Sequence, residues 1–274
     1  MRIKIIILCL LYVSIFISCK KEQLLDGESS GNSTVLILSK VLLNNQCSNE
    51  YLYNDSNLVS EEKSKIDYTM NHYNDKGQLV TSEYYTNDDI LSSDAQIFAT
   101  AINSTDLVTP ENGQKGGSIT YEYNANAQLI KSSYSQSTST SSEYSEFSYD
   151  ANNRINRQTM YWANSATGYI DYSYDTKGNL IKEALYNMPS TGVVELITTT
   201  SYVFDNSKNP YKLFRRLMIP GINTNVNNII KETNTIHLTP DQGPDNVQIT
   251  TTSYKYNAMG YPISKNGNVA YVYE

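Results

Sequence analysis

Histidine is almost absent from this 274-residue chain, which has only His72 and His237. His72 lies inside a predicted strand, His237 lies beside an irregular segment, and neither belongs to a helical metal-binding motif. Carboxylates adjacent in sequence, such as Glu61 and Glu62, do not indicate two acids held across a cleft. The sequence therefore predicts no catalytic residue, no metal site and no cofactor, and we expect that the protein is not an enzyme.

Basic residues are also in deficit, with 21 Lys and Arg against 28 Asp and Glu. Removal of residues 1–18, argued below, would leave 19 basic side chains and a net charge of −9. A protein that binds nucleic acid needs a basic surface that displaces counterions from phosphates. The charge therefore argues against a nucleic-acid partner.

Long hydrophobic runs are missing except at the start, where "IIILCLLYVSIFI" follows the basic residues Arg2 and Lys4. This layout predicts a signal peptide over residues 1–18, because the run is too short for an ordinary membrane span. The segment "FISC" resembles a bacterial lipobox, with Phe16 where the common form has leucine. The resemblance implies that Cys19 is the lipid attachment site and first residue of the mature protein. We expect an exported protein of the cell envelope, most simply an outer-membrane lipoprotein. The sequence is compatible with an anchor in either leaflet of that membrane.

The region after Cys19, "KKEQLLDGESSGNST", is polar and contains Gly and Ser, which predicts a flexible tether over residues 19–34. Residues 35–274 then form a single domain. Because Cys9 leaves with the signal peptide and Cys19 carries lipid, Cys47 is the only cysteine left in the mature domain. An intrachain disulfide and a thiolate metal site are both excluded.

Aromatic residues other than tyrosine are few: 24 tyrosines stand against 5 phenylalanines and 1 tryptophan. Tyrosine and threonine suit a pleated, half-buried surface, so the composition predicts an all-β domain. A search for internal repeats then finds one unit seven times. The copies are "YLYNDSNLVS" from Tyr51, "NHYNDKGQLV" from Asn71, "YEYNANAQLI" from Tyr121, "FSYDANNRIN" from Phe147, "YSYDTKGNLI" from Tyr172, "YVFDNSKNPY" from Tyr202 and "YKYNAMGYPI" from Tyr254.

Each part of the unit has a local physical reason. Alternating tyrosines place both rings on one face of a strand. The following Asn or Asp begins a turn, a residue such as Gly178 tolerates positive φ, and an apolar pair opens the returning strand. Asp175 is Asn in other copies, which assigns it a turn role and predicts that Asp175→Asn leaves folding almost unaffected. The unit is a β-hairpin.

The repeats predict an antiparallel meander of roughly 12–14 strands in a strongly curved sheet, which can stay open or close into a soluble barrel. Uneven spacing between copies leaves insertions around residues 87–117 and 211–247. We expect the tight turns to line one rim and the long loops the opposite rim, where function tends to lie.

The motif "YSYDTKGNLIK" resembles the tyrosine–aspartate repeat of the rearrangement-hotspot and teneurin shells. The combination of "SCKKE", "NPYKLF", "NNIIKET" and "YKYNAMGYPISKNG" looks like a family of Bacteroidota lipoproteins of unknown function. That resemblance implies a porin-like sheet and no catalytic residues. It extends over roughly residues 35–274.

Three hypotheses for function remain. The first is a non-catalytic, lipid-anchored protein whose sheet binds a partner or acts as a scaffold. The second is a glycan-binding or glycan-processing lipoprotein that uses the long-loop rim, for which Tyr161 and Trp162 form a candidate platform for a sugar or a peptide. The third is a shell or adhesion relative of the tyrosine–aspartate repeat proteins. Acids converging with Trp162 in a deep cleft would favour the second hypothesis, and a closed interior packed with tyrosine would favour the scaffold.

Overall fold

The chain is all-β. The computed structural model describes residues 36–87, 89, 106–136, 142–189, 192–214, 219–239, 241 and 243–274. Its strands are β1 Leu38–Leu43, β2 Gln46–Tyr53, β3 Val59–Ser64, β4 Asp67–Tyr73, β5 Leu79–Thr86, β6 Gln114–Tyr123, β7 Leu129–Gln136, β8 Glu143–Tyr149, β9 Ile155–Trp162, β10 Ser165–Tyr174, β11 Leu180–Asn187, β12 Glu195–Phe204, β13 Ile229–Ile236, β14 Asn246–Thr251, β15 Tyr254–Tyr256, β16 Pro262–Lys265 and β17 Val269–Tyr273. A short 3-10 helix, η2, spans Pro210–Phe214.

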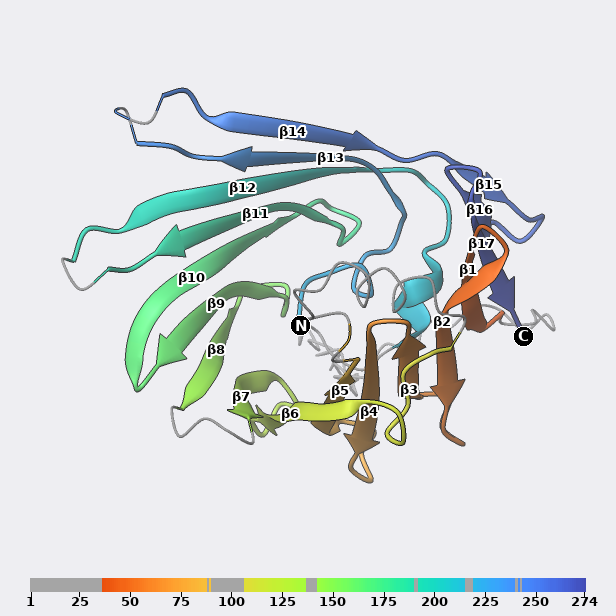
Figure 1. Cartoon of the computed structure of the whole chain (residues 1–274). Coiled ribbons are helices and arrows are strands. Elements are labelled where there is room, and N and C mark those ends of the chain that lie inside the picture. The colour runs from red at the N-terminus through yellow and green to blue at the C-terminus, as the bar shows by residue number, and fades with distance from the viewer. Residues whose placement is uncertain are drawn as a thin grey trace, which may run out of the picture. The chain divides into compact units, whose positions relative to one another are not determined.

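The strands form one antiparallel 17-stranded sheet in which successive strands pair along the chain, except β14 and β15, and β17 pairs with β1 (Figure 1). The predicted meander is confirmed, with more strands than expected because short strands follow Thr252. The sheet does not close into a barrel. The Thr252 amide donates to the Ile230 carbonyl of β13, whereas the Ser253 amide donates to Asn266, so the chain changes partners between β14 and β15.

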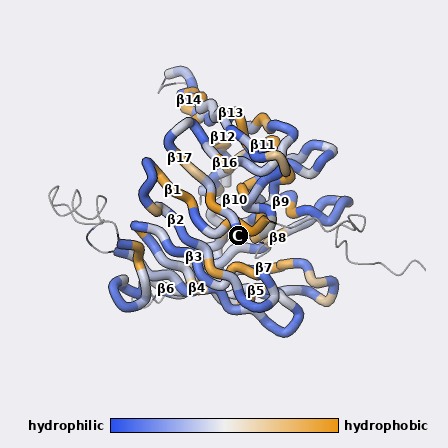
Figure 2. The backbone as a smooth tube through the Cα atoms, turned by 90° about the vertical axis from the view of Figure 1, so that its right-hand side faces the viewer, coloured by the Kyte–Doolittle hydropathy of each residue, from blue (hydrophilic) through white to orange (hydrophobic). Residues whose placement is uncertain are grey.

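The sheet is strongly curved and wraps around the segment that contains η2 (Figure 1). We call the face that packs against residues 205–214 and 219–228 the inner face. Hydrophobic stretches along the strands are short and alternate with hydrophilic ones (Figure 2), as expected for strands with one buried face. One residue of each apolar pair is fully buried there, for example Leu79, Leu129, Ile155 and Leu180 at 0–2% exposure.

In five of the seven copies the second tyrosine links neighbouring hairpins, and Tyr273 of β17 makes the same kind of contact. The hydroxyl donates a hydrogen bond of 2.5–2.9 Å to the carbonyl of a buried residue that begins an earlier strand, whereas the sixth copy has Phe204 at this position and Tyr256 of the seventh donates to Asp205. The pairs are Tyr53–Leu38, Tyr73–Val59, Tyr123–Leu79, Tyr149–Leu129, Tyr174–Ile155 and Tyr273–Pro262. Phenylalanine cannot make this bond, which explains why tyrosine dominates the aromatic residues of the chain. A buried carbonyl left unpaired would cost about 1–3 kcal/mol.

The turns of the repeats follow the predicted chemistry. In the Asp175 turn, one carboxylate oxygen accepts the backbone amides of Lys177 and Asn179 at 2.9 and 2.8 Å. Asn74 uses its side-chain oxygen in the same way, accepting two amides at 3.0 Å. The glycine-like position has positive φ even where it is Ala127, at 61°. The assignment of Asp and Asn to a structural role is therefore supported by their identical bonds.

The Asp or Asn that begins each turn has a second side-chain oxygen or nitrogen, and its bonding partner differs between copies. This difference changes the expectation that Asp175→Asn leaves folding almost unaffected. The other Asp175 oxygen accepts from the Asn179 side-chain amide at 2.9 Å, while the Asn74 amide donates to Gln78 at 3.0 Å. Asn179 is 1% exposed, and its own oxygen accepts the backbone amides of Val226 and Asn227. Its amide is thus fixed and cannot rotate to suit a new partner.

Asp175→Asn should therefore destabilise the domain by about 1–2 kcal/mol, because two amide groups would face each other in a buried site. Burial raises the pKa of Asp175, but bonds from Asn179 and the turn outweigh it, and the pKa is lowered overall. The matched control is Asn74→Asp, where Asn74 is exposed, the half-buried Gln78 can rotate its amide and no loss is expected. Urea denaturation of both variants checks this; equal stability of the two would contradict the fixed Asn179.

The insertion after β12 corrects the prediction that tight turns and long loops occupy opposite rims. It begins at Asp205, the turn position of the sixth copy, and therefore lies on the rim of the repeat turns. It folds back onto the inner face, where Phe214 is 2% exposed and packs 4.6 Å from the Tyr51 ring. An inner face rich in tyrosine and poor in aliphatic residues gains its apolar partners from this segment. Most of the insertion at 87–117 lies outside the described residues.

Candidate functional site

A cleft of about 520 Å³ opens on the inner face across strands β5 to β10. Its volume lies within the range of about 300–1,000 Å³ that is usual for ligand sites. Aromatic and apolar side chains line it together with a few polar groups. The lining residues are Tyr84, Ile119, Tyr121, Ser132, Tyr134, Glu143, Tyr144, Ser145, Gln158, Met160, Tyr161, Trp162, Thr167 and Ile219.

Both predicted platform residues, Tyr161 and Trp162, line this cleft. They do not form one platform, however, because successive residues of a strand point to opposite faces. Trp162 is paired with Glu143 across β8 and β9 and shares the face of Met160. The Tyr161 ring instead stacks on Tyr144 at a centroid distance of 4.6 Å and an interplanar angle of 8°.

Trp162 is the most exposed aromatic group of the cleft, at 48%. It ends β9 next to a two-residue turn of Ala163 and Asn164, whose φ values are 47° and 64°. The tight turn pairs Trp162 with Ser165 of β10, so the indole is held at a strand end rather than on a long loop. A held aromatic ring loses little conformational entropy when a ligand binds.

The floor of the cleft is polar and ordered by hydrogen bonds. The Gln158 amide donates to the Ser145 hydroxyl at 3.0 Å, and its oxygen accepts from the Tyr172 hydroxyl at 3.0 Å. Burial raises the pKa of Tyr172, so the phenol stays protonated and donates. These bonds fix the Gln158 side chain, which places a defined donor and acceptor in the cleft, on the same face of β9 as Trp162.

Two further features of the cleft escaped sequence analysis. Glu143 begins β8, and only the pairing of β8 with β9 brings it beside Trp162. Ile219 comes from the insertion and packs against the buried cluster that includes Tyr121 and Phe147. Neither residue belongs to a repeat, so no sequence signal marked them. The meeting of one acid with Trp162 in a cleft is the observation that favours the glycan hypothesis.

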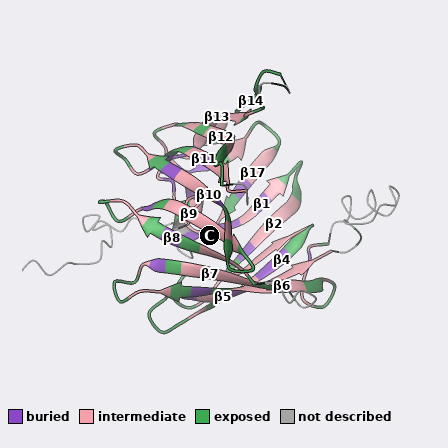
Figure 3. Cartoon of the chain, turned by 90° about the vertical axis from the view of Figure 1, so that its left-hand side faces the viewer, coloured by how far each residue is buried: buried purple, intermediate pink, exposed green. Residues whose placement is uncertain are grey.

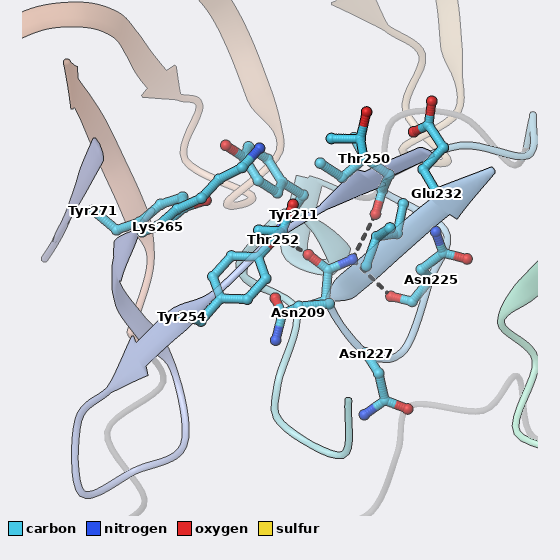
Figure 4. Close-up of a pocket in the computed structure, with 13 residues that line it drawn as sticks. Asn209, Tyr211, Asn225, Asn227, Glu232, Thr250, Thr252, Tyr254, Lys265 and Tyr271 are labelled. Carbon is cyan, nitrogen blue, oxygen red and sulfur yellow. Dashed lines mark hydrogen bonds between the residues drawn. The ribbon is translucent and has the colours of Figure 1, made fainter. Parts of the chain in front are cut away.

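A second pocket, of about 200 Å³, lies where the insertion meets β13 to β17 (Figure 4). The Asn209 side-chain amide there donates to the carbonyls of Ile222 and Asn225, at 2.5 and 2.9 Å. Asn225 in turn accepts the Leu180 backbone amide at 2.8 Å. These buried asparagines are used to hold the insertion against the sheet, so we assign this pocket a structural role.

The remaining candidates are placed as follows. His237 contacts Asp245 through Nδ1 at 2.7 Å and Thr199 through Nε2 at 2.9 Å, and His72 lies on β4. The described residues contain no group of three or more His, Cys, Asp or Glu side chains that could hold a metal ion. Within the same part of the chain, no helix has the length and hydrophobicity needed to cross a membrane. The predicted signal peptide, Cys19 and the tether lie outside the described residues.

No family model matches the chain, and no curated protein matches it. Among solved structures, a porin-like protein from Bacteroides uniformis is 13% identical and has a TM-score of 0.38, over 86% of this chain and 98% of that one. A porin-like protein from Bacteroides vulgatus is 11% identical with a TM-score of 0.38, over 88% and 99%. The Photorhabdus luminescens Tc holotoxin pore is 13% identical with a TM-score of 0.18, over 83% of this chain and 13% of that one. The likenesses are too weak to assign a function.

Proposed function

We propose that this chain is an exported, lipid-anchored protein of the cell envelope whose sheet binds a carbohydrate chain in the cleft around Trp162, without chemical change to the ligand. The observation that carries the proposal is an indole 48% exposed above a cleft with a fixed polar floor. Sugar rings present an apolar face that stacks on aromatic rings and hydroxyl groups that bond to amides and carboxylates. Trp162, Gln158 and Glu143 offer these three kinds of contact.

The acids of the cleft support binding rather than hydrolysis. Glycosidases of the usual kind use two carboxyl groups, about 5–9.5 Å apart, on either side of the scissile bond. Among the described residues that line the cleft, Glu143 is the one carboxylate. The part of the inner face around Phe214 is filled by its own side chains, which gives less support to the hypothesis of a shell that encloses another protein.

The envelope location rests on the leader and on Cys19. Cys19→Ala should move the protein from the detergent phase to the aqueous phase in a phase-partition assay, because no acyl chains would be attached. Cys47→Ala is the control and should leave partitioning unchanged. An aqueous wild-type protein, or a Cys19→Ala protein that stays with the detergent, would contradict lipid anchoring while leaving the cleft untouched.

Trp162→Ala should weaken polysaccharide binding about 10- to 100-fold, because removal of a stacked aromatic ring costs about 1.5–3 kcal/mol. Retention in gels that contain neutral or acidic polysaccharides measures this. Tyr169→Ala is the matched control, since that ring stacks on Tyr186 at 4.6 Å and does not line the cleft. Equal retention of wild type and Trp162→Ala would contradict the proposed site. Release of shorter sugars by wild type but not by Glu143→Gln would show hydrolysis instead of binding.

A further inference from the structure

Strand β14 has a free edge. It pairs with β13 on one side, and no residue register joins its other side to a described strand, since the next strand, β15, pairs with β16. All six of its residues are exposed, including Val247 at 55% and Ile249 at 57% (Figure 3). Figure 1 likewise shows β14 at an extremity of the sheet, with β13 as its neighbour. Two aliphatic side chains on an open strand edge are a template for pairing with another strand.

The backbone groups that face this edge follow from the register. The Thr252 amide donates to the Ile230 carbonyl of β13. Antiparallel strands alternate between residues that bond to a given neighbour and residues that bond away from it. Gln248 and Thr250 therefore bond to β13, whereas the N–H and C=O groups of Val247 and Ile249 point to the free edge.

The edge carries none of the features by which sheets prevent pairing. The β14 sequence "NVQITT" contains no lysine, no proline and no charged residue. No register shift interrupts its pairing with β13, so no bulge twists it away. Edges exposed in this way invite a partner strand, and proteins that avoid association usually block them.

The strand is complementary to itself when two copies run antiparallel about a twofold axis at Gln248. Val247 then lies opposite Ile249 of the second copy, so every aliphatic residue on that face meets another. On the other face, Gln248 meets Gln248, and Asn246 meets Thr250. A shift of the axis to Val247 would place Ile249 opposite Asp245, and a shift to Ile249 would place Val247 opposite Thr251.

Charge supports the same register. Lys231 of β13 is paired with Thr251 of β14, and Thr251 would lie opposite Asp245 of the second copy. Neighbouring strands are about 4.8 Å apart, so the Lys231 and Asp245 Cα atoms would be about 10 Å apart, within reach of the two side chains. The twofold axis makes this contact twice.

We propose that the free edge of β14 is a homodimer interface, in which two copies of this chain join antiparallel β14 strands into one continuous sheet. The interface is isologous, since the same surface serves both copies. A six-residue strand buries less than the roughly 800 Å² per partner of a standard interface, so association should be weak and depend on concentration. The inference does not depend on the identity of the ligand in the cleft.

Disulfide trapping tests the register directly. The test uses the full chain with Cys9→Ser, Cys19→Ala and Cys47→Ser, which removes every native thiol. The Gln248–Gln248 pair would be a non-hydrogen-bonded pair with Cα atoms about 4.5 Å apart, inside the range for a disulfide. Gln248→Cys should therefore form at least about tenfold more covalent dimer under mild oxidation than Thr250→Cys, whose Cα atoms would be about 13 Å apart.

Two further measurements complete the test. Adding Ile249→Lys to the Gln248→Cys protein should abolish cross-linking, because two charges would enter the aliphatic contact while the exposed position still tolerates lysine. Sedimentation of the chain without Gln248→Cys should show a dimer fraction that rises with concentration and is lost with Ile249→Lys. Equal cross-linking of Gln248→Cys and Thr250→Cys, or a monomer at every concentration, would overturn the proposal and leave the edge for a strand of another protein.

Discussion

Raising the pH above about 10 should unfold the domain in a single transition, and ionisation of the buried tyrosines should coincide with the loss of β structure. Burial raises the pKa of Tyr123 and Tyr149 to about 12, and it raises the pKa of Tyr53, Tyr174 and Tyr273 further. Each of these phenols donates a hydrogen bond to a buried carbonyl, which it can do only while protonated.

The sign of the effect follows from the direction of these shifts. A tyrosine in an unfolded chain has a pKa of about 10, so the folded state holds its protons more tightly. The stabilisation is complete below about pH 10 and is lost as the pH rises towards the folded values. Each of the five phenols removes up to about 1 kcal/mol per pH unit after allowance for partial solvent exposure, against a total stability of about 5–15 kcal/mol.

Near-ultraviolet absorbance of tyrosinate and far-ultraviolet circular dichroism, followed together over this pH range, measure both events. Tyr149→Phe should destabilise the protein by about 1 kcal/mol at neutral pH, because the Leu129 carbonyl loses its donor, and should make the alkaline transition less steep. A β signal that persists after all 24 tyrosines have ionised would contradict the role of the hydroxyl groups as links between hairpins.

Phe214→Ala should cost about 3–5 kcal/mol of unfolding free energy, the range expected for removing a fully buried phenylalanine. Phe214 is 2% exposed and contacts the rings of Tyr51, Tyr53 and Tyr211 at centroid distances of 4.6, 6.4 and 5.4 Å. Removal of this ring would leave a cavity between the insertion and the inner face of β1 to β3.

Phe214→Leu is the matched control and should cost much less, since most of the volume is kept. Chemical denaturation of the two variants measures the difference. A loss below about 1 kcal/mol for Phe214→Ala would show that the insertion contacts the sheet without stabilising it. That result would contradict the conclusion that the insertion supplies the apolar partners of the inner face.

The repeat made much of the fold predictable. Alternating tyrosines, the Asx residue and the residue of positive φ define a hairpin by local chemistry, and the hairpins recur as predicted. The bond from Tyr149 to the Leu129 carbonyl was not predictable, because it joins residues of different copies and depends on register. The insertion was expected on a rim, yet Phe214 enters the inner face, since burial of a phenylalanine outweighs exposure of a loop.

The candidate site was predictable in one residue and not in its geometry. Trp162 stood out as the only tryptophan next to a turn, and it lines the cleft. The alternation of a strand could have separated Tyr161 from it, because adjacent residues face opposite sides. Glu143 is 19 positions away and reaches Trp162 only through strand pairing, which a single sequence does not reveal. Asp175 shows the same limit, since the fixed amide of Asn179 depends on the distant Val226 and Asn227.

The most direct test of the central claim, that the inner cleft binds a carbohydrate chain, uses the fluorescence of Trp162. As the only tryptophan of the chain, it reports on the cleft without any label. Titration with soluble polysaccharides should produce a saturable change in intensity and a blue shift for at least one of them, because stacking removes water from an indole that is 48% exposed. A spectrum that no polysaccharide alters, while calorimetry of the same samples detects binding, would place the ligand elsewhere and contradict the account.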